Sequence, residues 1–339
     1  MPSSSPSTQT TIPTRILIIS DTHSFQFGNP RYPLSLENLP SDIDVLLHCG
    51  DLTNIGGLAE YRGALKMLGQ IPARLKLVVA GNHDRTLDRE WVLRSLGRGK
   101  GIEDGDEEER ESERQEEEED LQECKEGNEI MRGELAREAG VQYLEEGVSE
   151  WDVGNGARLR IYSSPYTPEF CGWGWAYERD EDRFNGVGER GEGVKEVSGA
   201  VRVPSWGDAD GERGVDVVMT HGPPMGVLDV VDPGREHVGC ESLMRALRRA
   251  RPRLFCCGHI HEAHGAEVVE WKNEGGGKFA EMGERRKVED KWPEIERLEI
   301  EYGKETLMVN ASIMDLSYRP TNKPWFLEID LPRAEEVEV

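Results

Sequence analysis

Five short motifs in this chain of 339 residues place histidine, aspartate and asparagine at spacings that suit metal binding. In chain order the motifs are Asp21-Thr22-His23, Gly50-Asp51, Gly81-Asn82-His83-Asp84, Thr220-His221 and Gly258-His259-Ile260-His261. Five of the eight histidines lie within these motifs. Imidazole and carboxylate ligands together suit Mn, Fe, Zn, Ni or Co better than Mg or Ca. The motifs therefore predict a site for divalent metal ions.

Each motif comes at the end of a short apolar run that is typical of a strand buried on both faces. The runs occupy residues 15–20, 44–50, 75–81, 215–222 and 253–259. Because ligands of open α/β sheets bind beyond the carboxyl ends of the strands, we expect the five ends to converge on one point. Helical patterns at 57–71 and 240–250 lie between strands, so the predicted fold class is α/β.

The spacing within the motifs favours two metals over one. Residues two apart in an extended segment point the same way, which pairs Asp21 with His23 and His259 with His261. Between these pairs, Asp51 supplies a carboxylate, a group that can bridge two ions.

In this order, the motifs resemble those of the metallophosphoesterase superfamily, also called calcineurin-like phosphoesterases. The longer stretches DVLLHCGDLTNIG, SSPYTPEF and THGPP resemble the metallophosphoesterase domain-containing group known from animal brain proteins and from fungi. The resemblance spans roughly residues 15–330 apart from insertions. It implies a four-layer α/β/β/α sandwich of two mixed β-sheets flanked by helices, with the metals at one end of both sheets.

The resemblance further implies two divalent ions, with Mn²⁺ preferred and Fe, Zn, Ni or Co as alternatives. One ion would be held by Asp21, His23, Asp51 and His261. The other would be held by Asp51, Asn82, His221 and His259. A hydroxide that bridges the two ions would then attack the phosphorus in line.

Four further residues are candidates for roles beside the metals. By the same resemblance, His83 would stabilise the developing charge or protonate the leaving oxygen, as a general acid does. Asp84 would accept a hydrogen bond from His83 and fix its tautomer. Asn54 and Arg85 are candidates for lining the substrate pocket.

The implied activity is hydrolysis of a phosphodiester or phosphomonoester, with a small molecule or a (cyclic) nucleotide as substrate. Two branches of the superfamily are excluded. Residues 50–56 lack the arginine that protein Ser/Thr phosphatases carry there, and Asn54 stands where purple acid phosphatases need tyrosine. The alternative is a non-catalytic nucleotide-binding or scaffold protein on the same fold.

Composition limits the partners. The net charge is −25, whereas nucleic-acid binding needs basic patches, so nucleic acid is an unfavoured partner. No apolar stretch is long enough for a membrane helix, and we expect no membrane partner. The N-terminus has no secretory signal pattern and the six cysteines have no regular spacing. These features predict a cytoplasmic protein, or alternatively a nuclear one, with reduced thiols.

The organisation along the chain follows from changes in composition. We expect a disordered lead over 1–13, one domain over 14–332 and an acidic tail over 333–339. Insertions are predicted at about 99–133, at 185–214 and, as a hairpin, at 264–304. The first insertion is strongly acidic and predicts a solvated loop or a frayed helix, with a protein partner as an alternative role.

Outside the motifs, we expect His48 to pack in the core.

Overall fold

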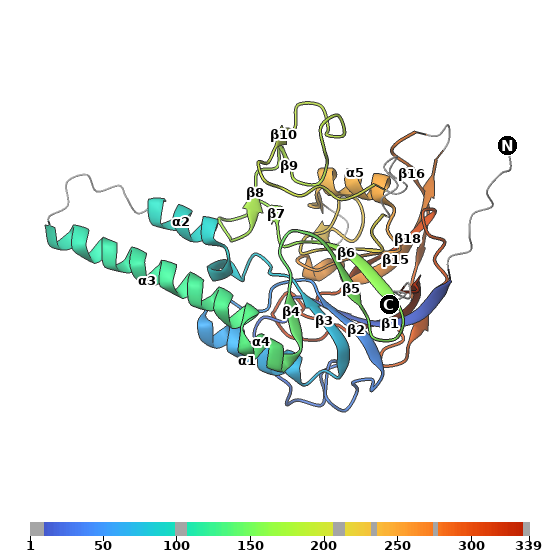
Figure 1. The fold of residues 1–339 in the computed structure, drawn as a ribbon, viewed down its shortest axis with the longest axis horizontal. Coiled ribbons are helices and arrows are strands. Elements are labelled where there is room, and N and C mark those ends of the chain that lie inside the picture. The colour runs from blue at the N-terminus through green and yellow to red at the C-terminus, as the bar shows by residue number, and fades with distance from the viewer. Residues whose placement is uncertain (1–9, 99–106, 206–213, 232–235, 274–276, 335–339) are drawn as a thin grey trace, which may run out of the picture.

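The apolar runs of the sequence form the strands of two mixed β-sheets that pack face to face (Figure 1). The structure is a computed structural model that describes residues 10–98, 107–205, 214–231, 236–273 and 277–334. The six-stranded sheet has the order β17 (Glu296–Arg297), β19 (Trp325–Pro332), β1 (Thr11–Ile19), β2 (Ile43–His48), β3 (Ala73–Val78), β4 (Val141–Tyr143). The seven-stranded sheet has the order β16 (Glu281–Lys287), β15 (Gly265–Lys272), β18 (Glu305–Asn310), β14 (Leu254–Cys257), β11 (Val217–Thr220), β6 (Arg158–Ser164), β5 (Gly147–Asp152).

Shorter elements complete the fold. Three small sheets pair β7 (Thr167–Pro168) with β8 (Ala176–Tyr177), β9 (Glu181–Asp182) with β10 (Lys195–Glu196), and β12 (Val230–Val231) with β13 (Glu236–His237). The α-helices are α1 (Leu58–Gly69), α2 (Arg89–Arg98), α3 (Glu107–Arg132), α4 (Glu134–Ala139) and α5 (Glu241–Ala250). Two 3₁₀ turns are η1 (Arg85–Leu87) and η2 (His261–Ala263).

Alternation along the strands explains why the runs are apolar throughout. In β1, Ile16 and Ile18 lie in the core between the two sheets, whereas Leu17 and Ile19 lie in the core under the helices. Successive strand residues point to opposite faces, so a strand that is covered on both faces needs apolar residues at every position.

Helices cover the outer face of each sheet. Residues of α1, the C-terminal end of α3 and α4 pack on the six-stranded sheet, with Tyr61 and Met131 among the fully buried side chains. Helix α5 packs on the seven-stranded sheet through Leu243, Ala246 and Leu247. The predicted four-layer α/β/β/α sandwich is therefore confirmed.

Parallel pairing brings the strand ends together. Strands β1 to β4 run parallel in one sheet, and β6, β11, β14 and β18 run parallel in the other. A backbone bridge between Ser20 and Ser312 joins the two sheets directly after β1 and β18. The motifs that follow these strands consequently lie at one end of the sandwich.

Both predicted terminal segments include residues that hydrogen bonds tie to the sandwich. Thr11, Ile12 and Pro13 pair antiparallel with the end of β19, so the predicted disordered lead over 1–13 overlaps strand β1. These residues alternate polar and apolar too briefly to stand out in a Ser- and Thr-rich segment. Within the predicted tail over 333–339, Arg333 and Ala334 donate backbone hydrogen bonds to Thr10 and Gly156. The rest of both predicted segments, 1–9 and 335–339, lies outside the described residues.

The acidic insertion forms a helix, one of the two alternatives that its charge allows. Helix α3 projects away from the sandwich in Figure 1, and only its C-terminal end joins the core through Ile130 and Met131. Residues 99–106 of this predicted insertion lie outside the described part of the chain. The long acidic stretch is helical because its apolar end packs against α1 and α4.

The other two insertions differ in how far they leave the sandwich. Residues 185–205 pack over α5, where the buried Arg249 guanidinium donates to the carbonyls of Val203 and Phe184; 206–213 lie outside the described residues. The predicted hairpin within 264–304 exists as β15 and β16, but β15 also pairs with β18 inside the large sheet. The predicted start of this insertion therefore needs correction. Glutamates on the exposed face of β15 obscured its alternating pattern.

Within the described residues, no helix has both the length and the apolar character that a membrane span requires.

His48 packs in the core at the end of β2. The side chain is fully buried, its Nδ1 accepts a hydrogen bond from the Gly50 amide at 3.2 Å, and its Nε2 lies 3.0 Å from Thr22 Oγ1. Burial lowers the pKa of His48 from 6.5 to about 4, although the charges of Asp21 and Asp51 act in the opposite direction. His48 is therefore neutral in the folded protein at neutral pH.

This pKa predicts a pH dependence of stability. The unfolded chain binds a proton at His48 below a pKa of about 6.5, whereas the folded chain binds it only near 4, so acid favours the unfolded state in this window. In the presence of a chelator, we expect the unfolding free energy of the wild type to fall by roughly 2 kcal/mol between about pH 7 and about pH 5, relative to His48→Asn. Urea denaturation of both proteins measures this difference. Parallel pH curves for the two would contradict the prediction.

Candidate metal centre

The polar motifs meet in the space between the carboxyl ends of the two sheets. The amide of His259, from the seven-stranded sheet, donates to both carboxylate oxygens of Asp21, from the six-stranded sheet, at 3.0 Å each. The Nδ1 of His221 lies 2.8 Å from the carbonyl oxygen of Cys49 in the opposite sheet. Hydrogen bonds across the sandwich therefore fix the relative positions of the motifs.

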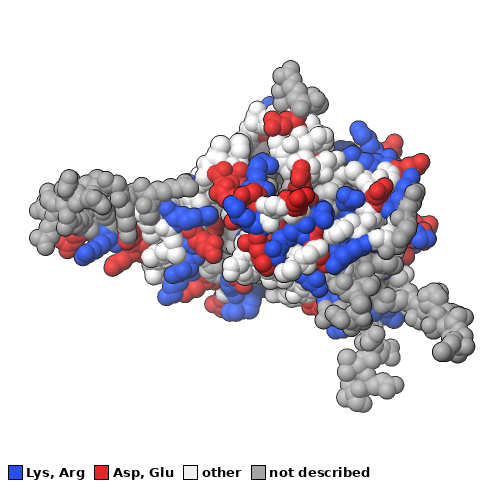
Figure 2. Space-filling model, turned by 90° about the horizontal axis from the view of Figure 1, so that it is seen from above, with Lys and Arg blue, Asp and Glu red and all other residues white. Residues whose placement is uncertain are grey.

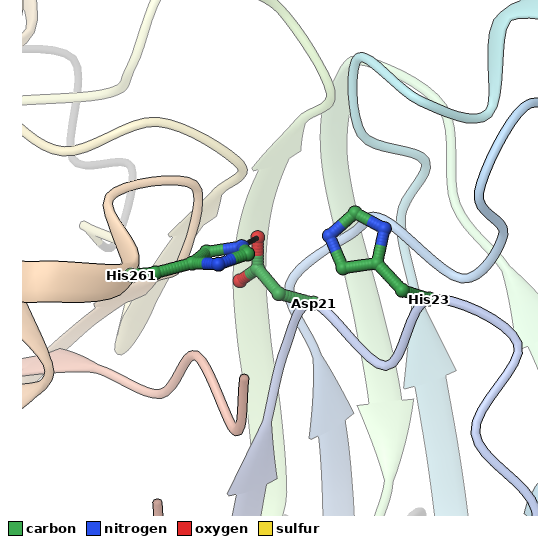
Figure 3. Close-up of side chains that lie close together, drawn as sticks. All are labelled: Asp21, His23 and His261. Atoms are coloured by element: carbon green, nitrogen blue, oxygen red, sulfur yellow. Dashed lines mark ion pairs between the residues drawn. The ribbon is translucent and has the colours of Figure 1, made fainter. Parts of the chain in front are cut away.

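A first group of ligand atoms comes from Asp21, His23 and His261. One such atom from each residue lies within 4.8 Å of the other two. Figure 3 shows His261 reaching the Asp21 carboxylate from one side while His23 lies on the other, and Nε2 of His261 is 3.3 Å from Asp21 Oδ1. These are three of the four residues predicted for the first ion.

A second group comes from Asp51, His221 and His259, again within 4.8 Å of one another. The Nε2 of His221 lies 3.4 Å from Asp51 Oδ2 and 2.9 Å from Asn82 Oδ1. All four residues predicted for the second ion are thus side by side.

The carboxylate of Asp51 lies between the two groups. Its Oδ2 is 3.6 Å from Nε2 of His23, a member of the first group, and 3.4 Å from Nε2 of His221 in the second. Its other oxygen accepts a hydrogen bond from the His83 amide at 2.8 Å, which fixes the orientation of the carboxylate. One oxygen is therefore within reach of both groups.

The protonation pattern of the imidazoles fits metal ligands. The Nδ1 atoms of His23 and His221 face the backbone carbonyls of Thr53 and Cys49 at 3.1 and 2.8 Å. A proton on each Nδ1 satisfies these carbonyls and leaves a lone pair on each Nε2. The Nε2 of His23 is buried and has no hydrogen-bond partner among the residues that the structure describes. The Nε2 of His221 faces Asn82 Oδ1, a second acceptor. A cation between these acceptors satisfies all of them.

The carboxylates of the centre are ionised. Burial raises the pKa of Asp21, but the hydrogen bond and charge of His261 outweigh this effect and lower the pKa below its usual range. For Asp51, burial is likewise outweighed by the charge of His221, and its pKa is also lowered. For the paired His221, the Asp51 charge overcomes burial and raises the pKa to about 9, so a proton occupies Nε2 until a metal ion replaces it. By contrast, burial lowers the pKa of His259 to about 3.

Comparison with known sequences identifies the family. Residues 14–263 match the sequence profile of the calcineurin-like phosphoesterases. This chain belongs to the calcineurin-like phosphoesterase family. Its members are generally hydrolases that bind divalent metals, and the two groups of ligand atoms provide sites for such ions.

Relatives match most of this calcineurin-like phosphoesterase. The human and mouse metallophosphoesterase domain-containing protein 1 are each 28% identical to it over 325 residues, which cover 94% of this chain and 72% of the relative. A probable rhamnogalacturonate lyase C of Emericella nidulans is 29% identical over 259 residues, which cover 76% of this chain but 18% of that protein.

Left-handed backbone occurs at several of the predicted metal ligands. Asp21, Asp51 and His259 have φ angles of 53°, 55° and 67°, in the left-handed region that residues with a Cβ rarely adopt. Each such residue costs on the order of 1–3 kcal/mol, and it persists only where the surrounding structure holds it. The strand ends therefore turn sharply so that the ligand side chains point toward one another.

The glycines of the motifs permit the close approach of the strand ends. A Cβ atom on Gly81 would overlap the amide nitrogen and carboxylate of Asp51. A Cβ atom on Gly258 would overlap the Asp21 carboxylate and the side chain of Ser20. In both motifs, glycine leaves the space that the ligand carboxylate occupies.

The role predicted for Asp84 needs a correction. The Nδ1 of His83 lies 2.6 Å from the carbonyl oxygen of Asn54, and this carbonyl takes the place that the sequence assigned to Asp84. The Asp84 carboxylate instead accepts hydrogen bonds from the amides of Leu52, Thr53 and Gly81 and from the Thr53 hydroxyl. Asp84 is adjacent to His83 in the chain but points into the interior, so it ties the Gly50-Asp51 turn to the next motif.

The two candidates for substrate contacts lie next to His83 but are engaged with their own loop. The Asn54 side-chain amide donates to Glu60 at 3.0 Å. The Nε of Arg85 donates to the Ile55 carbonyl at 2.8 Å. Their role in binding substrate stays a prediction.

Two aromatic residues that were not among the predicted site residues lie at the centre. Trp173 stacks on His83, with ring centroids 4.0 Å apart and an interplanar angle of 26°. Tyr318 is 51% exposed, and its ring centroid lies 4.8 Å from that of His23 and 5.5 Å from that of His261. Both residues come from loops far from the metal motifs in sequence, so only the fold brings them here.

The close packing around Gly258 predicts the effect of adding one methyl group. We expect Gly258→Ala to displace the Asp21 carboxylate and to weaken Mn²⁺ binding roughly tenfold or more, as measured by isothermal titration calorimetry. Gly28→Ala is the matched control, because a Cβ atom there meets nothing within 4 Å. Equal Mn²⁺ affinity for the two variants would show that the contact at Gly258 does not shape the centre.

Proposed function

We propose that this protein is a dinuclear-metal phosphoesterase that hydrolyses a small phosphodiester or phosphomonoester, including (cyclic) nucleotides. The main support for this proposal is the position of the Asp51 carboxylate between the two ligand groups. Its Oδ2 lies within 3.6 Å of imidazole nitrogens from both groups. A carboxylate so placed can bridge two ions. A site that holds a single metal has no need for one.

The ligands divide between the two ions as follows. One ion would be held by Asp21, His23, His261 and Asp51, and the other by Asp51, Asn82, His221 and His259. When bound, two such ions supply an activated water and a clamp on the phosphoryl oxygens. With the ions bound, the two ionised carboxylates and otherwise neutral ligands would leave the centre positive enough to attract a phosphate ester.

The proposed reaction gives His83 a role at the leaving oxygen. One of its ligand atoms lies within 4.8 Å of those of His23 and Asp51, so its ring borders the centre while remaining partly exposed. Because Nδ1 donates to the Asn54 carbonyl, Nε2 is the nitrogen left to stabilise charge or, in the imidazolium form, to donate a proton.

Surface charge supports a small substrate over a nucleic acid. On the face drawn in Figure 2, Lys and Arg side chains are mixed with Asp and Glu rather than gathered in one basic stripe. A nucleic-acid backbone needs such a stripe. As an alternative partner, we propose a protein that binds the acidic helix α3.

We further propose Mn²⁺ as the resident metal and the cytoplasm as the compartment. All six cysteines are free thiols, as is usual in a reducing compartment. The mixed imidazole and carboxylate ligands favour Mn²⁺, Fe, Zn, Ni or Co over Mg²⁺ or Ca²⁺.

The proposal predicts metal-dependent turnover that requires Asp51. We expect the Mn²⁺-loaded protein to hydrolyse bis-p-nitrophenyl phosphate, with p-nitrophenyl phosphate and cyclic nucleotides tested in parallel. Asp51→Asn should lower kcat/KM by more than about a hundredfold, because the neutral amide is a poor bridge between two cations. Asp330→Asn is the control, since this carboxylate is exposed on β19.

Absence of hydrolysis by the Mn²⁺-loaded wild type on the whole panel would refute the proposed activity. Nucleotide binding in a calorimeter without product formation would then favour the non-catalytic alternative.

A further inference from the structure

The aromatic loop over residues 170–175 closes directly on the turn that carries His83. Trp173 stacks face to face on the His83 imidazole at a centroid distance of 4.0 Å. On another side, the ring of His23 approaches His83 edge-on, at 4.7 Å and an interplanar angle of 86°. The imidazole is thus held between the face of an indole and the edge of a metal ligand.

Hydrogen bonds fix this loop to the same turn. The amide of Gly174 donates to the carbonyl of Asn82 at 3.2 Å, and the indole of Trp175 donates to the carbonyl of Asp84 at 3.2 Å. These two bonds flank His83 in the sequence, since they use the carbonyls directly before and after it. The loop is therefore joined to the turn on both sides of His83.

Contacts on the far side anchor the loop to the body of the protein. The buried Asp88 carboxylate accepts a hydrogen bond from the Trp175 amide at 2.6 Å. The indole of Trp91 donates to the carbonyl of Gly172 at 2.8 Å. A Cβ atom on Gly174 would lie 3.0 Å from the Arg85 Cα, which shows how closely the two backbones approach. Trp173 lies between these anchored positions, so its ring is held in place.

We propose that Trp173 is a positioning residue that sets the plane of the His83 imidazole for the reaction. The hydrogen bond from Nδ1 to the Asn54 carbonyl fixes one atom of the ring but leaves it free to pivot about that bond. Stacking on Trp173 removes this freedom and fixes the plane of the ring beside His23 and Asp51. The inference rests on the proposed function, because it assigns a purpose to His83 within that reaction.

The test compares Trp173→Ala and Trp173→Phe in the full-length, Mn²⁺-loaded protein with bis-p-nitrophenyl phosphate. We expect Trp173→Ala to lower kcat roughly ten- to hundredfold while KM and Mn²⁺ affinity change little, because the proposed role acts through the His83 ring and not through contacts with substrate or metal. Trp173→Phe should restore most of kcat, because a phenyl ring can stack in the same place. Phe170→Ala is the matched control, since this aromatic residue of the same loop is 62% exposed.

A double-mutant cycle with His83→Ala separates positioning from a general structural effect. If Trp173 acts through His83, Trp173→Ala should have almost no further effect on kcat in the His83→Ala background. An undiminished effect there, or a loss expressed in KM, would overturn the inference while leaving the proposed function intact. An inactive wild type would instead refute the proposed function.

A readout independent of turnover is the carbon-bound proton signal of His83 in NMR spectra of histidine-labelled protein. Stacking predicts an upfield ring-current shift that Trp173→Ala removes and Phe170→Ala retains. An unchanged His83 signal in Trp173→Ala would show that the stack does not form in solution.

Discussion

Several buried acceptor atoms meet in one small volume at the carboxyl ends of the two sheets. The structure of this end of the molecule depends on that arrangement. The Nε2 atoms of His23 and His221, the amide oxygen of Asn82 and the carboxylate of Asp51 lie within a few ångströms of one another. Buried acceptors that face each other destabilise a fold unless a cation or protons lie between them. This arrangement would destabilise a purely structural core, whereas metal ions between the acceptors would stabilise it.

The rest of the sandwich makes this convergence possible. Left-handed backbone at Asp21, Asp51 and His259 is unfavourable locally, and it occurs where strands β1, β2 and β14 leave the core. Apolar side chains between and outside the sheets hold those strands in register, so hydrophobic burial holds the strained turns in place. Asp84 and His48 add hydrogen bonds that tie neighbouring turns together without being ligands themselves.

The sequence alone predicts what depends on local pattern. The strand runs, the α/β class and the five motifs are all readable because each is short and follows a fixed period or spacing. Combined with the family resemblance, they predict the layered fold and which ligand residues lie together. The contacts between side chains within the site are harder to predict from the sequence. Asp84 illustrates this, because its adjacency to His83 in the sequence says nothing about where its carboxylate points.

Features that depend on distant segments could not be predicted. Trp173 and Tyr318 reach the centre from loops whose aromatic residues look like ordinary packing. Strand β15 was hidden because charged residues on its exposed face resemble the surrounding Gly- and Glu-rich segment. Likewise, the start of β1 reads as part of a polar lead until its partner β19, at the other end of the chain, is known.

The pairing of β1 with β19 also has a consequence for how the protein is made. Thr11 lies opposite Pro332, so the first strand emerges from the ribosome long before its neighbour on one side exists. Until β19 has been made, that edge of β1 is open. Contacts between such distant segments slow folding and prolong exposure of apolar edges. The apolar edge of β1 therefore stays unpaired on one side for as long as it takes to make the roughly three hundred residues between the two strands.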